Sequence, residues 1–289
     1  MSKNIEYDIN RLRDYSSLFS RNEIQRWQKG NLYSIQKKAD RYDKSKFIGS
    51  NKSHLNYLQY VYKALENQYR NEYVVKNSFL NQWLVKELGK SHSKAFNEFR
   101  VGNAIADLAM FNGVSKAFEI KTELDSDKRL NLQLENYRKV FNQVYLIVPH
   151  SKLELYKKYD SEIGIISFES SNKNHFHLKR EAQNFNIIDA VEVMKILHGS
   201  EYKKIVINHY GSLPKMTSFN QFDICKELIY KIPNNTLNEY FIESMKDRGS
   251  DNALSCRFFK EFNQISLALK MNKVQKKELI DILKLPLYN

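Results

Sequence analysis

The stretch of residues 98–137 constrains the fold of this chain more than any other part of the sequence. Two short runs rich in β-forming residues lie on either side of Asn112-Gly113, and the second run ends at Lys121 before the apolar pattern turns helical. Side chains alternate along a strand, so Glu119 and Lys121 point to one face while Ile120 points to the other. The pattern predicts a hairpin with one polar face and one buried face.

The length of the turn decides whether Asp107 joins this polar face. A two-residue turn would pair Asp107 with Phe118 and leave it on the other face. A three-residue connection, with Gly113 in the left-handed region and a bulge, shifts the pairing by one residue. We then expect Asp107 opposite Ala117 and diagonal to Glu119, on the polar face.

Two carboxylates and a lysine on one face suit metal-assisted hydrolysis of a phosphodiester. Hard oxygen ligands favour magnesium (Mg2+) or manganese (Mn2+), and the ion neutralises charge that develops on the phosphate. The lysine can orient a water molecule or help to deprotonate it. Asp107, Glu119 and Lys121 are therefore candidate catalytic residues, and the two acids are candidate metal ligands.

The spacing of these residues resembles a known motif. Asp107, eleven intervening positions and then Glu119-Ile120-Lys121 is similar to the motif of the PD-(D/E)xK nuclease superfamily. Gln133 and Tyr137, one helical turn apart after the lysine, look like a bacterial branch of small stand-alone members. Ile105 stands where much of that branch has an arginine.

The resemblance covers roughly residues 87–169 and implies an α/β fold. The expected core is a mixed central sheet with flanking helices, as in restriction endonucleases, with helical regions before and after it. It implies a metal-dependent nuclease in which Asp107 and Glu119 hold Mg2+ or Mn2+ and Lys121 acts on the water or the scissile phosphate. Gln133 and Tyr137 would support this site.

A further acid often precedes the first aspartate in this superfamily. The candidates here are Glu98 and Glu87, and Glu98 is preferred because it begins the β-rich run. Lys128, Arg129 and Tyr137 are candidate contacts to nucleic acid. Gln133 could instead be a glutamine at the edge of the core, hydrogen-bonded to backbone.

The charge of the chain predicts a polyanionic partner. The net charge is +13 and the pI is about 9.4, although frequent Lys, Asn, Ile, Phe and Tyr also fit an AT-rich genome. The excess is +6 in residues 1–75, +5 in 76–180 and +2 in 181–289. We therefore expect nucleic acid along the first two regions, with DNA favoured over RNA.

The same three regions form the predicted domain organisation. Residues 1–75 are expected to be a helical N-terminal arm, 76–180 the nuclease-like core, and 181–289 a helical accessory or protein-partner-binding domain. Periodicity and capping signals predict these elements. The helices are 21–27, 54–70, 79–88, 125–141, 153–159, 186–197, 222–232, 237–246, 253–269 and 274–283, and the later strands are 144–148 and 163–168.

No apolar run is long enough to span a bilayer, and the polar N-terminal residues do not look like a signal peptide. Cys225 and Cys256 are too few for a disulfide framework and are expected in the core. His175 and His177 are expected on a surface loop or strand edge. These features predict a cytoplasmic protein without a membrane partner.

Two other hypotheses remain beside the nuclease. One is a nucleic-acid-binding module that keeps the fold without cleaving. The other is an interaction protein in which the motif is a coincidence of an ordinary sheet. Cleavage that depends on Mg2+ and on Lys121 separates the nuclease from the binding module and from the interaction protein.

Overall fold

The computed structural model describes residues 6–88, 93–123, 125–169, 176–249 and 259–288. The chain divides into two compact units. The first comprises Met1–Glu87, Glu169–Phe176 and Ser250–Asn289, and the second comprises Leu88–Phe168 and His177–Gly249. The first unit therefore joins segments from both ends of the chain. The predicted division into 1–75, 76–180 and 181–289 follows the order of the chain and remains a prediction.

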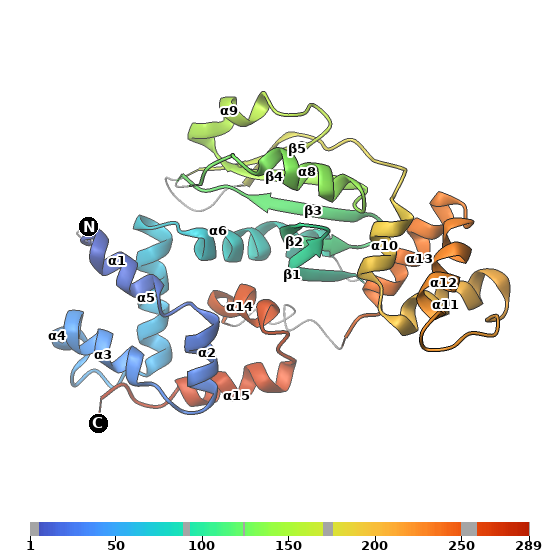
Figure 1. Ribbon diagram of the computed structural model, residues 1–289. Coiled ribbons are helices and arrows are strands. Elements are labelled where there is room, and N and C mark those ends of the chain that lie inside the picture. Colours follow the sequence, from blue (N-terminus) through green and yellow to red (C-terminus); the bar gives the residue numbers. More distant parts are fainter. Residues whose placement is uncertain (1–5, 89–92, 124, 170–175, 250–258, 289) are drawn as a thin grey trace. The chain divides into compact units, whose positions relative to one another are not determined.

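The first unit is helical, and we call it the helical unit (Figure 1). Its N-terminal part contains α1 (Ile9–Ser16), α2 (Arg21–Gln28), α3 (Tyr33–Tyr42), α4 (Lys44–Phe47), α5 (His54–Gln68) and α6 (Glu72–Phe79). A π-helical turn, η1 (Leu80–Leu84), and α7 (Val85–Leu88) follow. The C-terminal part adds η4 (Lys260–Phe262), α14 (Asn263–Ala268) and α15 (Lys273–Leu283).

Helix α5 shows why this unit folds as predicted locally. The Ser53 hydroxyl caps the helix by accepting a hydrogen bond from the Asn56 backbone amide, and the Asn56 side-chain oxygen accepts one from the Ser53 backbone amide. The predicted apolar stripe is buried and packs in one core with the C-terminal helices: Leu55, Leu58, Val61, Tyr62 and Leu65. The predicted cap and the predicted packing role of this helix are both confirmed.

The second unit is built on a six-stranded sheet, and we call it the sheet unit. The strands are β1 (Lys94–Val101), β2 (Ala104–Phe111), β3 (Ser115–Ile120), β4 (Gln143–Pro149), β5 (Gly164–Phe168) and β6 (Phe176–Arg180), adjacent in that order. The β1–β2 and β2–β3 pairs are antiparallel, while β3–β4 and β4–β5 are parallel. The predicted α/β class, a mixed sheet with flanking helices, is confirmed (Figure 1).

Helices connect the parallel strands of this sheet. Helix α8 (Leu130–Arg138) lies between β3 and β4, and η2 (His150–Lys152) with α9 (Leu153–Lys157) lies between β4 and β5. Leu130, Leu134 and Tyr137 of α8 are buried against the sheet, as is Phe141 after it. The predicted apolar stripe is therefore confirmed, and it fixes which face of α8 meets the strands.

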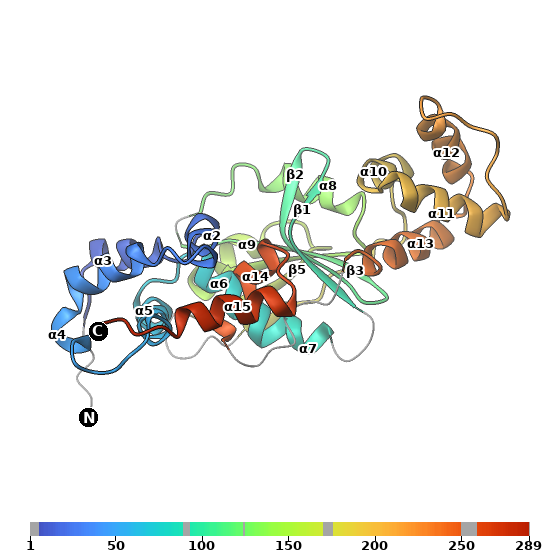
Figure 2. The same cartoon turned by 90° about the horizontal axis from the view of Figure 1, so that it is seen from below.

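Four further helices complete the sheet unit (Figure 2): α10 (Ala190–Ile196), α11 (Gly199–Tyr210), α12 (Gln221–Tyr230) and α13 (Asn234–Lys246). The predicted helix 186–197 begins too early, because the Asp189 side chain caps the amides of Val191 and Glu192. Helix α11 was not predicted. The backbone amide of its N-cap residue, His198, donates a hydrogen bond to the Glu201 carboxylate at 2.7 Å.

Cys225 is buried in the core of the sheet unit, as expected, and His177 is exposed on β6. Cys256 and His175 lie outside the described residues. None of the described helices is long and apolar enough to cross a membrane.

Candidate functional site

The β2–β3 connection sets the geometry of the site. Phe111 pairs with Ser115, so three residues connect the strands, and Gly113 has a φ of +101°. The predicted three-residue connection with a left-handed Gly113 is confirmed. The expected partner of Asp107 was wrong, because Ala117 pairs with Ala109 and the same register continued would put Asp107 opposite Glu119.

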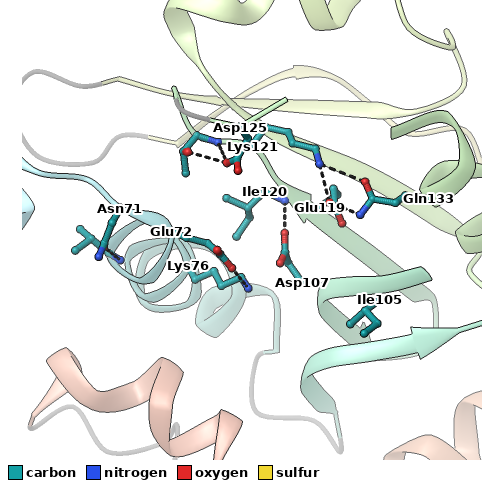
Figure 3. Close-up of polar contacts among 12 residues, drawn as sticks. Asn71, Glu72, Lys76, Ile105, Asp107, Glu119, Ile120, Lys121, Asp125 and Gln133 are labelled. Atoms are coloured by element: carbon teal, nitrogen blue, oxygen red, sulfur yellow. Dashed lines mark hydrogen bonds and ion pairs between the residues drawn. The ribbon is translucent and has the colours of Figure 1, made fainter. Parts of the chain in front are cut away.

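The two strands separate where Asp107 and Glu119 lie. Their ladder ends at the pair Leu108 and Phe118. Beyond it, the Asp107 Oδ2 accepts a hydrogen bond from the Ile120 amide at 2.7 Å, in place of a backbone carbonyl (Figure 3). Asp107 therefore holds the fork between β2 and β3 with its own carboxylate.

Glu119 is the centre of the polar network at this fork, and only 4% of its surface is exposed. Its Oε1 accepts from Lys121 Nζ at 2.9 Å and from Gln133 Nε2 at 2.8 Å. Lys121 Nζ also donates to Gln133 Oε1 at 3.3 Å, which closes a three-membered ring of contacts (Figure 3). Gln133 of α8 thus contacts both Lys121 and Glu119 and orients them.

Tyr137 contacts the second oxygen of this carboxylate. Its hydroxyl lies 2.8 Å from Glu119 Oε2 and 2.7 Å from the Ile105 carbonyl oxygen. Burial raises the pKa of Tyr137 far above its ordinary value, and the negative charge of Glu119 raises it further. The hydroxyl therefore stays protonated and acts as a hydrogen-bond donor.

The protonation of Glu119 reflects two opposing influences. Burial raises the pKa of the Glu119 carboxyl above its ordinary value, and the charge of Asp107 raises it further. Lys121 opposes both effects by its charge and its hydrogen bond. The Asp107 and Glu119 carboxylates are thus close enough to repel each other, which is an arrangement that a bound cation would relieve.

The donor set at the fork fits a hard divalent cation. Asp107 and Glu119 supply carboxylate oxygens from neighbouring strands, and Mg2+ usually combines one or two carboxylates with water. The described residues contain no group of three or more Asp, Glu, His or Cys side chains arranged to hold a metal. A metal held by Asp107 and Glu119 would need further oxygen ligands, such as water.

The two candidate additional acids lie in different places. Glu98 is exposed on β1, with a φ of +56°, and the β1–β2 register places it beside Asp107. Glu87 belongs to the helical unit and accepts a hydrogen bond from the Trp83 indole. The part of Glu98 in a ligand set remains a prediction.

Lys128 and Arg129 precede α8 and are exposed. The predicted helix start at Asp125 or Ser126 was wrong, because α8 begins at Leu130. The Asp125 carboxylate instead accepts from the amide and the hydroxyl of Thr122, each at 2.7 Å, which keeps this segment in a loop. The two basic side chains therefore extend from the loop that follows Lys121.

Arg100 was not predicted as a site residue, because residues 98–111 look like one β-rich run in the sequence. The chain turns at Gly102, whose φ is +53°, and Arg100 of β1 pairs with Ile105 of β2. Cross-strand partners share a face, so Arg100 lies diagonal to Asp107 at about 7–8 Å between backbones. Arg100 is exposed and contacts no other described residue by a hydrogen bond or ion pair. The Gly102-Asn103 pair was the signal that could have revealed this hairpin.

Comparisons with known proteins give one family and one curated relative. The family model described as bacteriophage P4 protein cII matches residues 65–280. Protein cII of Enterobacteria phage P4 is 32% identical over 175 residues, which cover 58% of this chain and 64% of that protein. The match thus spans less than two thirds of the relative's length.

Among solved structures, a protein of unknown function from Silicibacter pomeroyi aligns with 48% of this chain and 93% of its own. The TM-score is 0.32 and the sequence identity is 11%.

Proposed function

We propose that this chain, which belongs to the bacteriophage P4 protein cII family, is a metal-dependent nuclease that hydrolyses phosphodiester bonds of DNA. The proposal includes a restriction-endonuclease-like arrangement of the sheet unit and a requirement for Mg2+ or Mn2+. The observation that supports it most is the cluster of Asp107, Glu119 and Lys121 at the β2–β3 fork.

The burial of this cluster argues for a role beyond folding. Removing a carboxylate and an ammonium group from water opposes folding, and a buried ion pair often stabilises a protein no more than apolar residues would. Glu119 and Lys121 are nevertheless 4% and 7% exposed. Such an arrangement is expected where charge serves catalysis.

Each residue of the cluster has a proposed role. Asp107 and Glu119 would hold the metal, which supplies charge neutralisation and an acidified water when bound. Lys121, held 2.9 Å from Glu119 by the ring with Gln133, would position the attacking water or a phosphate oxygen. Tyr137 would keep the Glu119 carboxylate in its orientation.

Basic side chains around the fork would hold the DNA backbone. Arg100 lies diagonal to Asp107 on the β1–β2 hairpin, and Lys128 and Arg129 extend from the loop after Lys121. Arginine binds phosphate in a bidentate manner. We therefore assign to Arg100 the phosphate contact that Ile105 cannot make.

A binding module that does not cleave is the second candidate function. The observation that favours it is that no third acid joins Asp107 and Glu119 as a metal-binding group within the described residues. Such a module would bind DNA equally well with Mg2+ or with a chelator. It would not need Lys121.

A substrate panel tests the proposed function. Single- and double-stranded DNA and RNA would be incubated with Mg2+, Mn2+ or a chelator, using the wild type, Lys121→Ala and Lys139→Ala. Lys139 is exposed just after α8 and serves as the matched control for loss of a lysine. We expect metal-dependent DNA cleavage that Lys121→Ala abolishes with binding retained. Cleavage that Lys121→Ala and Lys139→Ala affect equally would contradict the assigned chemistry.

A further inference from the structure

Residues 21–52 of the helical unit contain a large share of the positive charge of the chain. The segment has nine Lys or Arg and three Asp or Glu, a net charge of +6 out of +13 for all 289 residues. It forms α2, α3 and α4 and precedes the residues matched by the family model, 65–280. The candidate active site uses none of its residues.

The three acids of this segment neutralise little of its positive charge at the protein surface. Asp43 is 3% exposed and pairs with Arg11 at 2.5 Å, and Glu23 pairs with Arg26 at 2.8 Å. Asp40 is the one exposed acid on α3, where it accepts from Gln36 and Tyr288. Asp14 of α1 pairs with Lys38 and with Arg41, and the other exposed lysines and arginines of the segment keep the field outside it positive.

Helix α3 arranges part of this charge in a stripe. Tyr33, Lys37 and Arg41 recur every four residues and so lie on one face, opposite the buried Ile35 and Ala39. Tyr33 is 70% exposed, and Lys37 Nζ lies 5.9 Å from its ring centre. The Arg41 side chain is 67% exposed. Lys44 and Lys46 continue the exposed charge into α4.

A buried polar network holds the end of α3 in place. Asp43, immediately after the helix, accepts hydrogen bonds from the hydroxyls of Tyr15, Tyr57 and Tyr60 at 2.6, 3.0 and 3.1 Å. These tyrosines belong to α1 and α5, which pack against α3. The stripe is thus presented by a helix anchored on both neighbours, so little ordering is required before it binds a partner.

We propose that the α3 stripe of Tyr33, Lys37 and Arg41, extended by Lys44, is a second DNA-binding surface that grips the phosphate backbone of a duplex. Spaced cations on a rigid helix complement a regular array of phosphates, and an exposed tyrosine adds contact with sugar or base. The choice of DNA as the polyanion rests on the proposed function. Binding here requires neither the metal nor Lys121.

Anisotropy of a labelled DNA duplex, measured with the full chain and a chelator, tests this surface. The variants are Lys37→Ala/Arg41→Ala and the matched pair Lys63→Ala/Lys277→Ala, which removes two exposed cations from α5 and α15 of the same unit. We expect the α3 pair to weaken binding about tenfold and to reduce the salt slope by about 2, with the control within about twofold. Equal losses for both pairs would overturn the proposal.

Two further measurements show whether a loss of binding by the α3 pair reflects lost charge, impaired folding or the catalytic site. Lys37→Arg/Arg41→Lys keeps the charges and should bind like the wild type, whereas weak binding by this variant would show that charge is not the determinant. Failure of the wild type to cleave in Mg2+ would defeat the nuclease proposal and leave this surface intact.

Discussion

Glu119 is the residue on which the proposed chemistry of the site depends. It is buried, it receives hydrogen bonds from three side chains, and the charge of Asp107 acts on it. Each of its partners restricts the orientation of the carboxylate. In the proposed nuclease, these contacts would hold Glu119 in one orientation for a bound cation.

Removal of one of these contacts should reduce activity without unfolding the chain. Tyr137→Phe deletes the hydroxyl 2.8 Å from Glu119 Oε2 and keeps the buried ring. We expect cleavage to fall by about 10–100-fold, as for other groups that orient metal ligands. The measurement is the rate of DNA cleavage against Mg2+ concentration.

Tyr156→Phe is the matched control, because Tyr156 is buried in the same core and forms no hydrogen bond with a described residue through its hydroxyl. It should cleave like the wild type. Similar losses in both variants would show that Tyr137 acts only through packing.

Bound Mg2+ should stabilise the folded chain through the two acids. A ligand that binds only the folded state raises stability by about 2.7 kcal/mol at one hundred times its Kd. We expect the unfolding midpoint of the wild type to rise with Mg2+, and that of Asp107→Ala to stay constant. An equal rise in both proteins would place the metal elsewhere.

At the scale of elements, α8 connects the fold to the site. One face packs Leu130, Leu134 and Tyr137 into the core, and Gln133 lies at the margin beside Lys121. Periodicity predicted this division of the helix correctly. Periodicity could not predict where α8 begins, because Asp125 accepts a hydrogen bond from Thr122 in a loop and so does not cap the helix.

The packing of α8 can be tested by two substitutions on one helix. Leu134 is 4% exposed, whereas Leu132 is 55% exposed. We expect Leu134→Ala to lower the free energy of unfolding by about 2–5 kcal/mol, since it leaves a cavity in the core. Leu132→Ala should change it by less than about 0.5 kcal/mol. Denaturant titration measures both, and equal effects would contradict the placement of the helix.

The start of α5 should make the helical unit sensitive to acid. His54 Nδ1 forms a hydrogen bond with the Leu285 carbonyl oxygen at 2.9 Å, and burial lowers the pKa of the His54 imidazole below its ordinary value of 6.5. The unfolded chain therefore binds more protons than the folded chain below that pH, and stability must fall as pH drops from about 6.5 towards the folded pKa.

We expect the unfolding midpoint of the wild type to decline over this range, and His54→Asn to flatten that decline. His150→Asn, at an exposed position on η2, should leave the decline unchanged. A pH profile that His54→Asn does not alter would assign the acid sensitivity to other groups.

At the scale of the whole molecule, local patterns predicted more than long-range organisation. The mixed sheet, the three-residue β2–β3 connection and the helix stripes follow from alternation, turn residues and period. The position of Asp107 opposite Glu119 follows from the three-residue connection itself, and the expected shift was in the wrong direction. The pairing of Arg100 with Ile105 follows from the two-residue turn at Gly102-Asn103, which was not recognised. The grouping of C-terminal helices with the N-terminal segment, by contrast, depends on packing between distant residues, which no local pattern specifies.

Nicking of supercoiled plasmid DNA by wild type and Asp107→Asn, each with Mg2+ and with a chelator, tests the central claim most directly. The substitution removes the charge of Asp107 with little change of shape. Joint metal binding by Asp107 and Glu119 predicts nicking by the wild type in Mg2+ alone and none by Asp107→Asn. Nicking by Asp107→Asn at the rate of the wild type, or no nicking by either protein, would contradict the claim.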